Sequence, residues 1–155
     1  MTGLQIDPTI LREYDIRGSV PENFNPEVIY AIARGFGTIV KRDGCQSVAI
    51  GYDGRLSSPE LEAAAVHGFI DCGLKVFRVG QGPTPMLYFA TFDIPADAGL
   101  MITGSHNPSN YNGAKMVVGG QPFCGPDIQK LGQLIADGDF EAGDGEAIDH
   151  PIMDT

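Results

Sequence analysis

The chain has 155 residues, of which 43% are apolar, and its formal net charge at neutral pH is −10. This length suits one domain with a sizeable core, and the acidic balance argues against binding to nucleic acid or to an anionic membrane, whose phosphates would repel the chain. Since no apolar run could span a bilayer and the first residues lack a signal-peptide pattern, we expect a cytoplasmic protein.

Helix and strand signals alternate along the chain. Asn25, Pro26 and Glu27 combine a capping side chain, a proline at the first helical position and an acid in the first turn, which predicts a helix. A second helix begins in the same way at Ser58 and ends before Gly73. Short apolar runs predict strands, and glycine–proline pairs predict two further helix starts. These strands span residues 47–51, 74–79, 98–102 and 114–118, and the helices span 82–92 and 126–135.

This alternation predicts an α/β domain with three layers, α/β/α, around a mixed, mostly parallel sheet of about four strands. The last two strands are joined by a short connection, so we expect them to pair as an antiparallel hairpin. Residues 1–138 form the predicted domain. Residues 139–155 are acidic and rich in glycine, without an apolar period, and are predicted to be a linker or a solvated tail.

The segment TGSHNP at residues 103–108 follows an apolar strand. Such a strand delivers Ser105 to the carboxyl edge of the sheet, where ligands of open α/β sheets bind. Gly104 leaves room for a phosphate to approach the backbone. A serine in a turn is usually only a turn residue, and it is a weak nucleophile without a partner.

The segment TGSHNP resembles the active-site signature of the α-D-phosphohexomutases, the phosphoglucomutase and phosphomannomutase family. Three further segments resemble that family's motifs in the same order: REYDIRG at 12–18, GYDGRLSSP at 51–59 and NYNGAK at 110–115. The bacterial phosphomannomutase/phosphoglucomutase branch is the most similar. The resemblance covers the first of the family's four domains, so we expect the chain to be that domain of a longer parent protein.

The resemblance implies an isomerase that acts on hexose phosphates, interconverting the 1- and 6-phosphates of mannose or glucose. Phospho-Ser105 would lend its phosphoryl group to the sugar, the hexose 1,6-bisphosphate intermediate would reorient, and its other phosphate would return to the serine. Mg²⁺ is the implied cofactor, bound here through the phosphate on Ser105, with its remaining ligands in the absent second domain. The implied partners are the hexose phosphate substrate and domains 2–4 of the parent chain.

Lys115 is the candidate general acid/base, since an amine near other cations and a divalent ion can have its pKa lowered toward neutrality. The alternative is a solvated lysine at a strand end. His106 is the second candidate, and we expect it to support the loop or orient the phosphate. The three cysteines, Cys45, Cys72 and Cys124, lack metal-site spacing and are expected to be free thiols without a function.

Substrate binding is expected from residues of the N-terminal and serine-loop motifs. Arg17 can bind phosphate bidentately and keeps its charge, and the resemblance places it beside Tyr14 in the active-site cleft. The alternative for Arg17 is a surface ion pair with a neighbouring acid. Asn107 is a third candidate for substrate binding, whereas Arg55 is expected to hold its own loop by hydrogen bonds.

Two other classes of function fit parts of the pattern. A serine hydrolase could use Ser105 and His106, but the nucleophile-elbow pattern GxSxG is absent, because Asn107 stands where its second glycine would be. A non-catalytic phosphosugar-binding or assembly module is the second alternative. The isolated chain would be such a module if it supplies only one wall of the active-site cleft.

Overall fold

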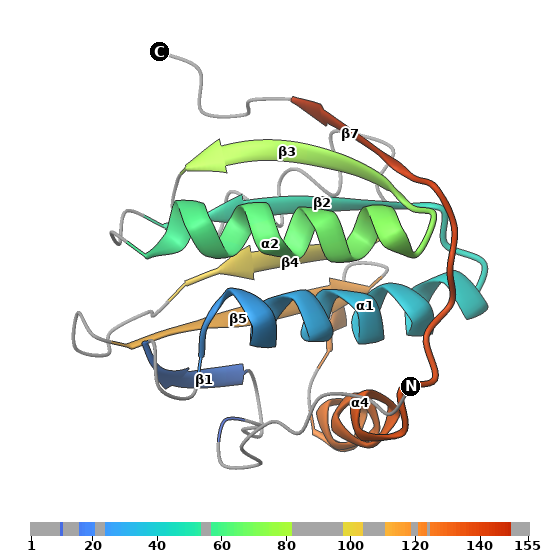
Figure 1. The fold of residues 1–155 in the computed structure, drawn as a ribbon, viewed down its shortest axis with the longest axis horizontal. Helices are drawn as coiled ribbons and strands as arrows, with labels where there is room; N and C mark the ends of the chain where they lie inside the picture. Colours follow the sequence, from blue (N-terminus) through green and yellow to red (C-terminus); the bar gives the residue numbers. More distant parts are fainter. Residues whose placement is uncertain are drawn as a thin grey trace.

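The computed structural model contains a mixed β-sheet with helices α1 and α2 packed against one face (Figure 1). It describes residues 10, 16–20, 24–53, 57–81, 98–103, 111–118, 121–123 and 125–149. The helices of this part are α1 (Pro26–Arg42), α2 (Ser58–Asp71) and α4 (Pro126–Asp137). Its strands are β1 (Ile16–Ser19), β2 (Ser47–Tyr52), β3 (Lys75–Gln81), β4 (Ala98–Ile102), β5 (Tyr111–Val118), β6 (Gln121–Pro122) and β7 (Glu146–Asp149).

The strand order of the sheet is β1-β5-β4-β2-β3-β7, and β6 pairs with β5. Strand β2 is parallel to β3 and β4, and β3 is parallel to β7. Strand β5 is antiparallel to β4, β1 and β6, so the predicted hairpin of the last two expected strands is confirmed. The α/β class is confirmed as well, but the sheet has seven strands in the described part rather than about four.

Helix α1 begins where its capping signal predicts. The Asn25 side chain accepts a hydrogen bond from the backbone N–H of Val28 at 3.0 Å, and Pro26 follows in the first turn of α1. Helix α2 begins at Ser58 as predicted, but Ser58 is not its cap: Ser57 precedes the helix, and its side chain makes no capping hydrogen bond. Helix α4 is followed by Gly138, whose φ of 68° lies in the left-handed region that favours glycine. The helix expected over residues 82–92 lies outside the described residues.

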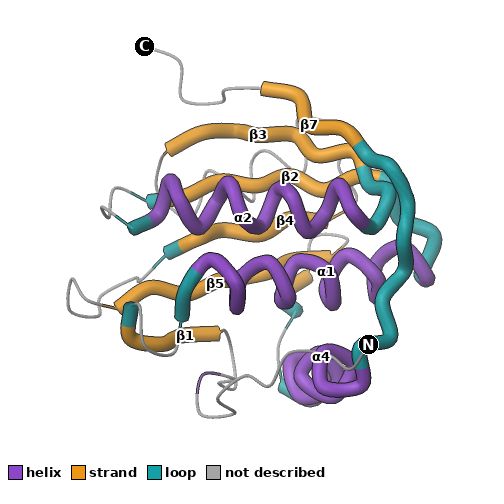
Figure 2. The backbone as a smooth tube through the Cα atoms, viewed as in Figure 1, coloured by secondary structure: helices purple, strands orange, loops and turns teal. Residues whose placement is uncertain are grey.

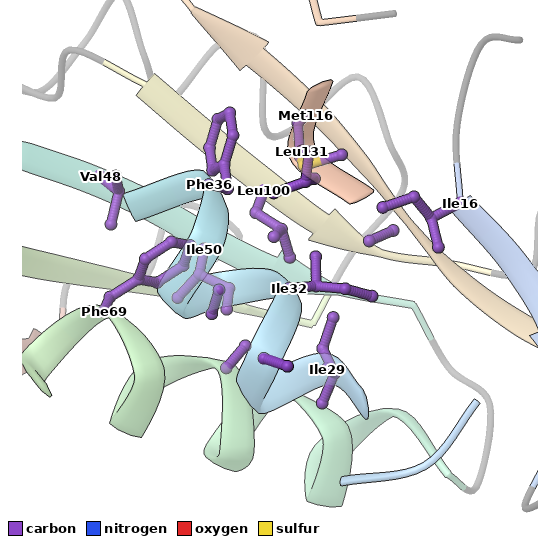
Figure 3. Close-up of a cluster of buried hydrophobic side chains, with 14 of the residues drawn as sticks. Ile16, Ile29, Ile32, Phe36, Val48, Ile50, Phe69, Leu100, Met116 and Leu131 are labelled. Carbon is purple, nitrogen blue, oxygen red and sulfur yellow. The ribbon is translucent and has the colours of Figure 1, made fainter. Parts of the chain in front are cut away.

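The core lies between the sheet and the helices, where Ile29, Ile32 and Phe36 of α1 point toward the strands (Figure 3). The Phe36 ring packs edge-on against Phe69 of α2. Helices α1 and α2 approach closely because Gly68 has no side chain: a Cβ there would lie 2.7 Å from the Ala33 Cβ.

The opposite face of the sheet is buried too. Strand residues that alternate with the helix-facing ones are at most 7% exposed: Ala49, Phe77, Val79, Met101 and Val117. A sheet buried on both faces is what a three-layer α/β/α domain requires. None of the described helices is both long and apolar enough to cross a membrane.

The segment after α4 packs on the domain and ends in strand β7 (Figure 2). Arg34 of α1 donates to the backbone oxygen of Glu141 at 3.0 Å, and the Glu141 N–H donates to Thr38 Oγ1 at 2.9 Å. Arg42 pairs with Asp139 at 3.0 Å. The sequence predicted no strand in this acidic segment. That the segment leads to a second domain stays a prediction.

Candidate functional site

The carboxyl ends of β2 and β4 lie side by side at one edge of the sheet, on the left in Figure 1. The backbone N–H of Asp53, which follows β2, donates to the Ile102 carbonyl at 2.9 Å. The N–H of Thr103, which follows β4, donates to the Gly113 carbonyl of β5 at 2.9 Å. Three of the four sequence motifs therefore meet at the edge where open α/β sheets bind ligands.

Four polar residues join these motifs in what we call the loop-end network: Asp53, Ser57, Ser58 and Asn112. The Asn112 amide nitrogen donates to Ser57 Oγ and to Ser58 Oγ, each at 2.9 Å. Ser58 Oγ in turn donates to Asp53 Oδ1 at 2.6 Å. Ser58 and Asn112 are both 0% exposed. Because buried polar groups that are fully paired hold one geometry, this network is a rigid part of the edge.

The loop-end network flanks two segments that carry predicted site residues. Asp53 and Ser57 stand at the two ends of residues 54–56, which include Arg55. Thr103, paired with Gly113, stands at the start of residues 104–110. The candidates Ser105, His106 and Asn107 fall in that second segment, and these three, like Arg55 and Tyr14, lie outside the described residues.

Arg17 belongs to strand β1, which is not among the strands predicted from the sequence. The backbone of Arg17 stands opposite Gly113 of β5, and that of Ile16 stands opposite Ala114. The pairing of β1 with β5 therefore places the end of the REYDIRG motif next to the NYNGAK motif. The structure describes only the backbone of Arg17, so its predicted contact with phosphate stays a prediction.

Lys115 lies in the middle of β5, opposite Met101 of β4, and its side chain is half-buried. Strand alternation places it on the face away from Asn112. In the described part of the chain, no side chain forms a hydrogen bond or an ion pair with Lys115. The lysine is thus neither at a strand end nor fully solvated, contrary to the alternative interpretation from the sequence.

The sequence analysis did not identify the loop-end network. Ser58 was interpreted only as a helix start, and Asn112 only as part of a motif. One signal was present: Asn112 occupies a row of alternating β5 positions whose other members, Ala114 and Met116, face the core. A polar residue in such a row needs hydrogen-bond partners when it is buried.

Within the described residues, no three His, Cys, Asp or Glu side chains gather closely enough to hold a metal ion. Asp53 is the acid of the loop-end network, and its Oδ1 already accepts from Ser58. A carboxylate oxygen has the chemistry that Mg²⁺ prefers, but one such group does not make a site. A Mg²⁺ ion at this edge would need further oxygen ligands from elsewhere.

A cavity of ≈ 620 Å³ lies at the other end of the sheet, beside the starts of β2 and β3. Its lysines already have partners: Lys41 Nζ donates to the Cys72 carbonyl at 2.6 Å, and Lys75 Nζ lies 3.9 Å from Glu146 Oε1. Because both cations are engaged and the cavity is far from the carboxyl ends of the strands, we assign it no part in the candidate site.

The architecture and the meeting of the motifs at one edge define an α/β domain of the class whose ligands bind outside the carboxyl ends of the strands. The sequence profile described as "Phosphoglucomutase/phosphomannomutase, alpha/beta/alpha domain I" matches residues 8–142. The chain belongs to the phosphoglucomutase/phosphomannomutase family and corresponds to its domain I.

Curated relatives agree with this assignment. The chain is 44% identical over 137 residues to a phosphomannomutase/phosphoglucomutase of Pseudomonas aeruginosa, covering 88% of this chain and 30% of the relative. It is 38% identical over 130 residues to a phosphomannomutase sequence from Klebsiella pneumoniae, covering 81% of each. The chain therefore spans about a third of the first of these relatives but most of the second.

A solved structure supports the fold. A phosphoglucomutase/phosphomannomutase family protein from Burkholderia thailandensis superposes with a TM-score of 0.92 at 38% identity. The superposition covers 96% of this chain and 34% of that one. Because the superposition covers nearly the whole chain, it includes at least part of the segment that follows α4.

Proposed function

We propose that this chain supplies the phosphoserine of a phosphohexomutase. The observation that carries the proposal is the position of Thr103: it directly follows β4 at the carboxyl edge, where its N–H donates to the Gly113 carbonyl, and it directly precedes the segment that contains Ser105. The family assignment and the identity of 44% to a phosphomannomutase/phosphoglucomutase support the same reaction.

The reaction consists of two phosphoryl transfers. In the first, the bond from phosphorus to Ser105 Oγ breaks and a bond to a hydroxyl oxygen of the hexose phosphate forms; that hydroxyl loses its proton, and Ser105 Oγ takes one up. The product is a hexose 1,6-bisphosphate and a free serine. After the bisphosphate reorients, the bond from its other phosphorus to the sugar oxygen breaks and a bond to Ser105 Oγ forms; the serine hydroxyl loses its proton, and the leaving sugar oxygen takes one up. Phosphoserine is restored, and the isomeric sugar phosphate leaves.

Lys115 is the proposed acid/base for these proton transfers, since lysine is one of the side chains that act as general acids and bases in enzymes. Arg17, Tyr14 and Asn107 are proposed to bind the sugar phosphate, and His106 to orient the phosphoryl group. Arginine suits this task because its fork of donors matches phosphate oxygens. Mg²⁺, when bound at the phosphoserine, would neutralise charge on the transferring group.

Coupled mutase assays on the complete reading frame that contains this chain would test the proposal. Wild type is compared with Ser105→Ala, using glucose 1-phosphate and mannose 1-phosphate. Ser109→Ala, four residues further along the same segment of the sequence, is the matched control. We expect Ser105→Ala to abolish turnover and Ser109→Ala to retain it. Turnover that survives in Ser105→Ala would overturn the phosphoserine role.

A second candidate function is a non-catalytic phosphosugar-binding or assembly module. It is favoured for the isolated chain, which spans 30% of the relative's length and so supplies one part of the cleft. We expect the isolated chain to have no mutase activity above its Ser105→Ala variant. Turnover of the isolated chain clearly above that variant would contradict this expectation.

A further inference from the structure

We propose that Asn112 is a positioning residue for the phosphoserine reaction, because its buried amide joins the end of the Ser105 segment to the end of the Arg55 segment. This inference rests on the proposed function. It concerns a residue that acts by holding the chain around it, not by touching the substrate.

The Asn112 amide has little freedom to move. Its nitrogen donates to both Ser57 Oγ and Ser58 Oγ at 2.9 Å, and its oxygen accepts from the Gly113 N–H at 2.9 Å. The residue is 0% exposed, so water cannot replace these partners. An amide with both ends bonded in a buried site is held in one orientation.

The Asn112 side chain leads to the first segment through Ser58. Ser58 Oγ accepts from Asn112 and donates to Asp53 Oδ1 at 2.6 Å, and Asp53 directly precedes residues 54–56. The backbone N–H of Asp53 is also fixed, since it donates to the Ile102 carbonyl of β4 at 2.9 Å. The start of the Arg55 segment is therefore held to both β4 and β5.

Asn112 is connected to the second segment, residues 104–110, through the backbone of its neighbour Gly113. Gly113, whose N–H bonds to the Asn112 side chain, accepts from the Thr103 N–H at 2.9 Å. Thr103 is 5% exposed and directly precedes residues 104–110. A short chain of hydrogen bonds thus connects the entrances of the two motif segments, although they are far apart in the sequence.

The rate of phosphoryl transfer is expected to depend on such a connection between the two segments. The reaction depends on in-line placement and on cations held around the transferring group, with little other help from the protein. A displacement of about 1 Å can slow such a reaction about one-hundredfold. Asn112 is absent from the predicted catalytic set, yet its loss would let the two segments shift relative to each other.

Steady-state kinetics of the complete reading frame would test this. Asn112→Asp keeps the side-chain shape but removes both amide donors, and it brings a second carboxylate near Asp53. We expect kcat to fall about 10- to 100-fold while KM changes by less than about threefold. Ser58→Ala and Asn112→Ala should each lower kcat similarly, and the double variant Asn112→Ala/Ser58→Ala should lose no more than either of these two single variants.

Ser57→Ala decides the matter if the Asn112 and Ser58 variants do not fold, because it removes one bond at a half-buried hydroxyl and leaves the rest of the network. It should lower kcat less than Ser58→Ala does but more than twofold. A role confined to stability would lower the melting temperature of Ser57→Ala and leave its kcat unchanged at a temperature well below melting.

The outcomes separate the two proposals. If wild-type turnover does not depend on Ser105, the proposed function fails, and the positioning role fails with it. If turnover depends on Ser105 but the folded network variants keep kcat within about twofold of wild type, only the positioning role is overturned. Amide hydrogen exchange provides a readout without substrate: residues 54–56 and 104–110 should exchange faster in Asn112→Asp, whereas α1 should not.

Discussion

The side-chain amide of Asn112 and the hydroxyl of Ser58 meet at 2.9 Å, although Asn112 lies in β5 and Ser58 begins α2. The same hydroxyl donates to Asp53 at 2.6 Å, so one buried oxygen links a strand, a helix start and the end of a second strand. Ser58 therefore connects three elements in addition to starting a helix.

Ser58→Ala is expected to lower the free energy of unfolding by about 1–3 kcal/mol, because it removes one acceptor of the buried Asn112 amide and one hydrogen bond to the Asp53 carboxylate. Urea denaturation monitored by circular dichroism measures the change. Ser57→Ala is the matched control: Ser57 is half-buried, so water can replace the lost partner, and the cost should be smaller. Equal losses in the two variants would contradict a special role of Ser58.

Much of the fold could be predicted because its signals are local. The Asn25 cap, the proline at each helix start and the apolar strand runs each specify structure within a few residues, and the structure has these elements in place. Strands β1, β6 and β7 were missed because they are short and their apolar pattern is weak. Pairing with β5 or β3 stabilises them, and such tertiary partners leave no local signal.

The candidate site also has one part that could be predicted from the sequence and one part that could not. Motif resemblance pointed to the segments around Ser105, Arg17 and Lys115, and the structure brings the strands next to them to one edge. The loop-end network could not be predicted from spacing, since Asn112 bonds to residues more than fifty positions away. Only the alternation of β5 suggested that a polar side chain would be buried there.

The contact between α1 and α2 predicts that Gly68→Ala is destabilising. Alanine favours a helix over glycine by about 1 kcal/mol, but a Cβ at this position would lie 2.7 Å from the Tyr30 carbonyl oxygen, which cannot move without shifting α1. We expect a net loss of about 1–3 kcal/mol in urea denaturation.

His67→Ala is the control for Gly68→Ala, because His67 is the preceding residue of α2 and is exposed. Its effect should stay within about 0.5 kcal/mol. A Gly68→Ala variant as stable as wild type would show that the two helices can separate at little cost.

Stability is expected to decline at alkaline pH because of Cys72 and Tyr30. Burial raises the pKa of the Cys72 thiol above 9.0. Burial, followed by the hydrogen bond to Asp71, raises the pKa of the Tyr30 hydroxyl above 10.0. The folded state holds these protons more tightly than the unfolded chain does, so their contribution is complete below about pH 9 and is lost as the pH rises from there through the raised pKa values of the folded state.

Urea unfolding at a series of pH values from 7 to about 11 would measure this decline. Cys72→Ala should lower the stability at every pH, since it empties a buried site, but the slope above about pH 9 should be shallower than in wild type. Tyr30→Phe should flatten the curve only above about pH 10. If the unfolding free energy of both variants falls with pH as steeply as in wild type, groups other than Cys72 and Tyr30 cause the loss of stability at alkaline pH.

Lys115 provides the sharpest test of the proposed chemistry. Its place in the middle of β5, half-buried and opposite Met101, holds the amine at one face of the sheet. If it transfers the proton, Lys115→Ala in the complete reading frame should lower kcat by about 10²-fold or more, with little change in KM. Lys115→Arg should not restore kcat, because a guanidinium keeps its charge but does not release a proton near neutral pH.

Lys130→Ala is the control for Lys115→Ala, since Lys130 lies exposed on α4 and its loss changes only the net charge. It should leave both kcat and KM as in wild type. A Lys115→Arg variant with full activity would show that positive charge, not proton transfer, is what Lys115 contributes. An unchanged kcat in Lys115→Ala would move the acid/base role to His106 or to another part of the enzyme.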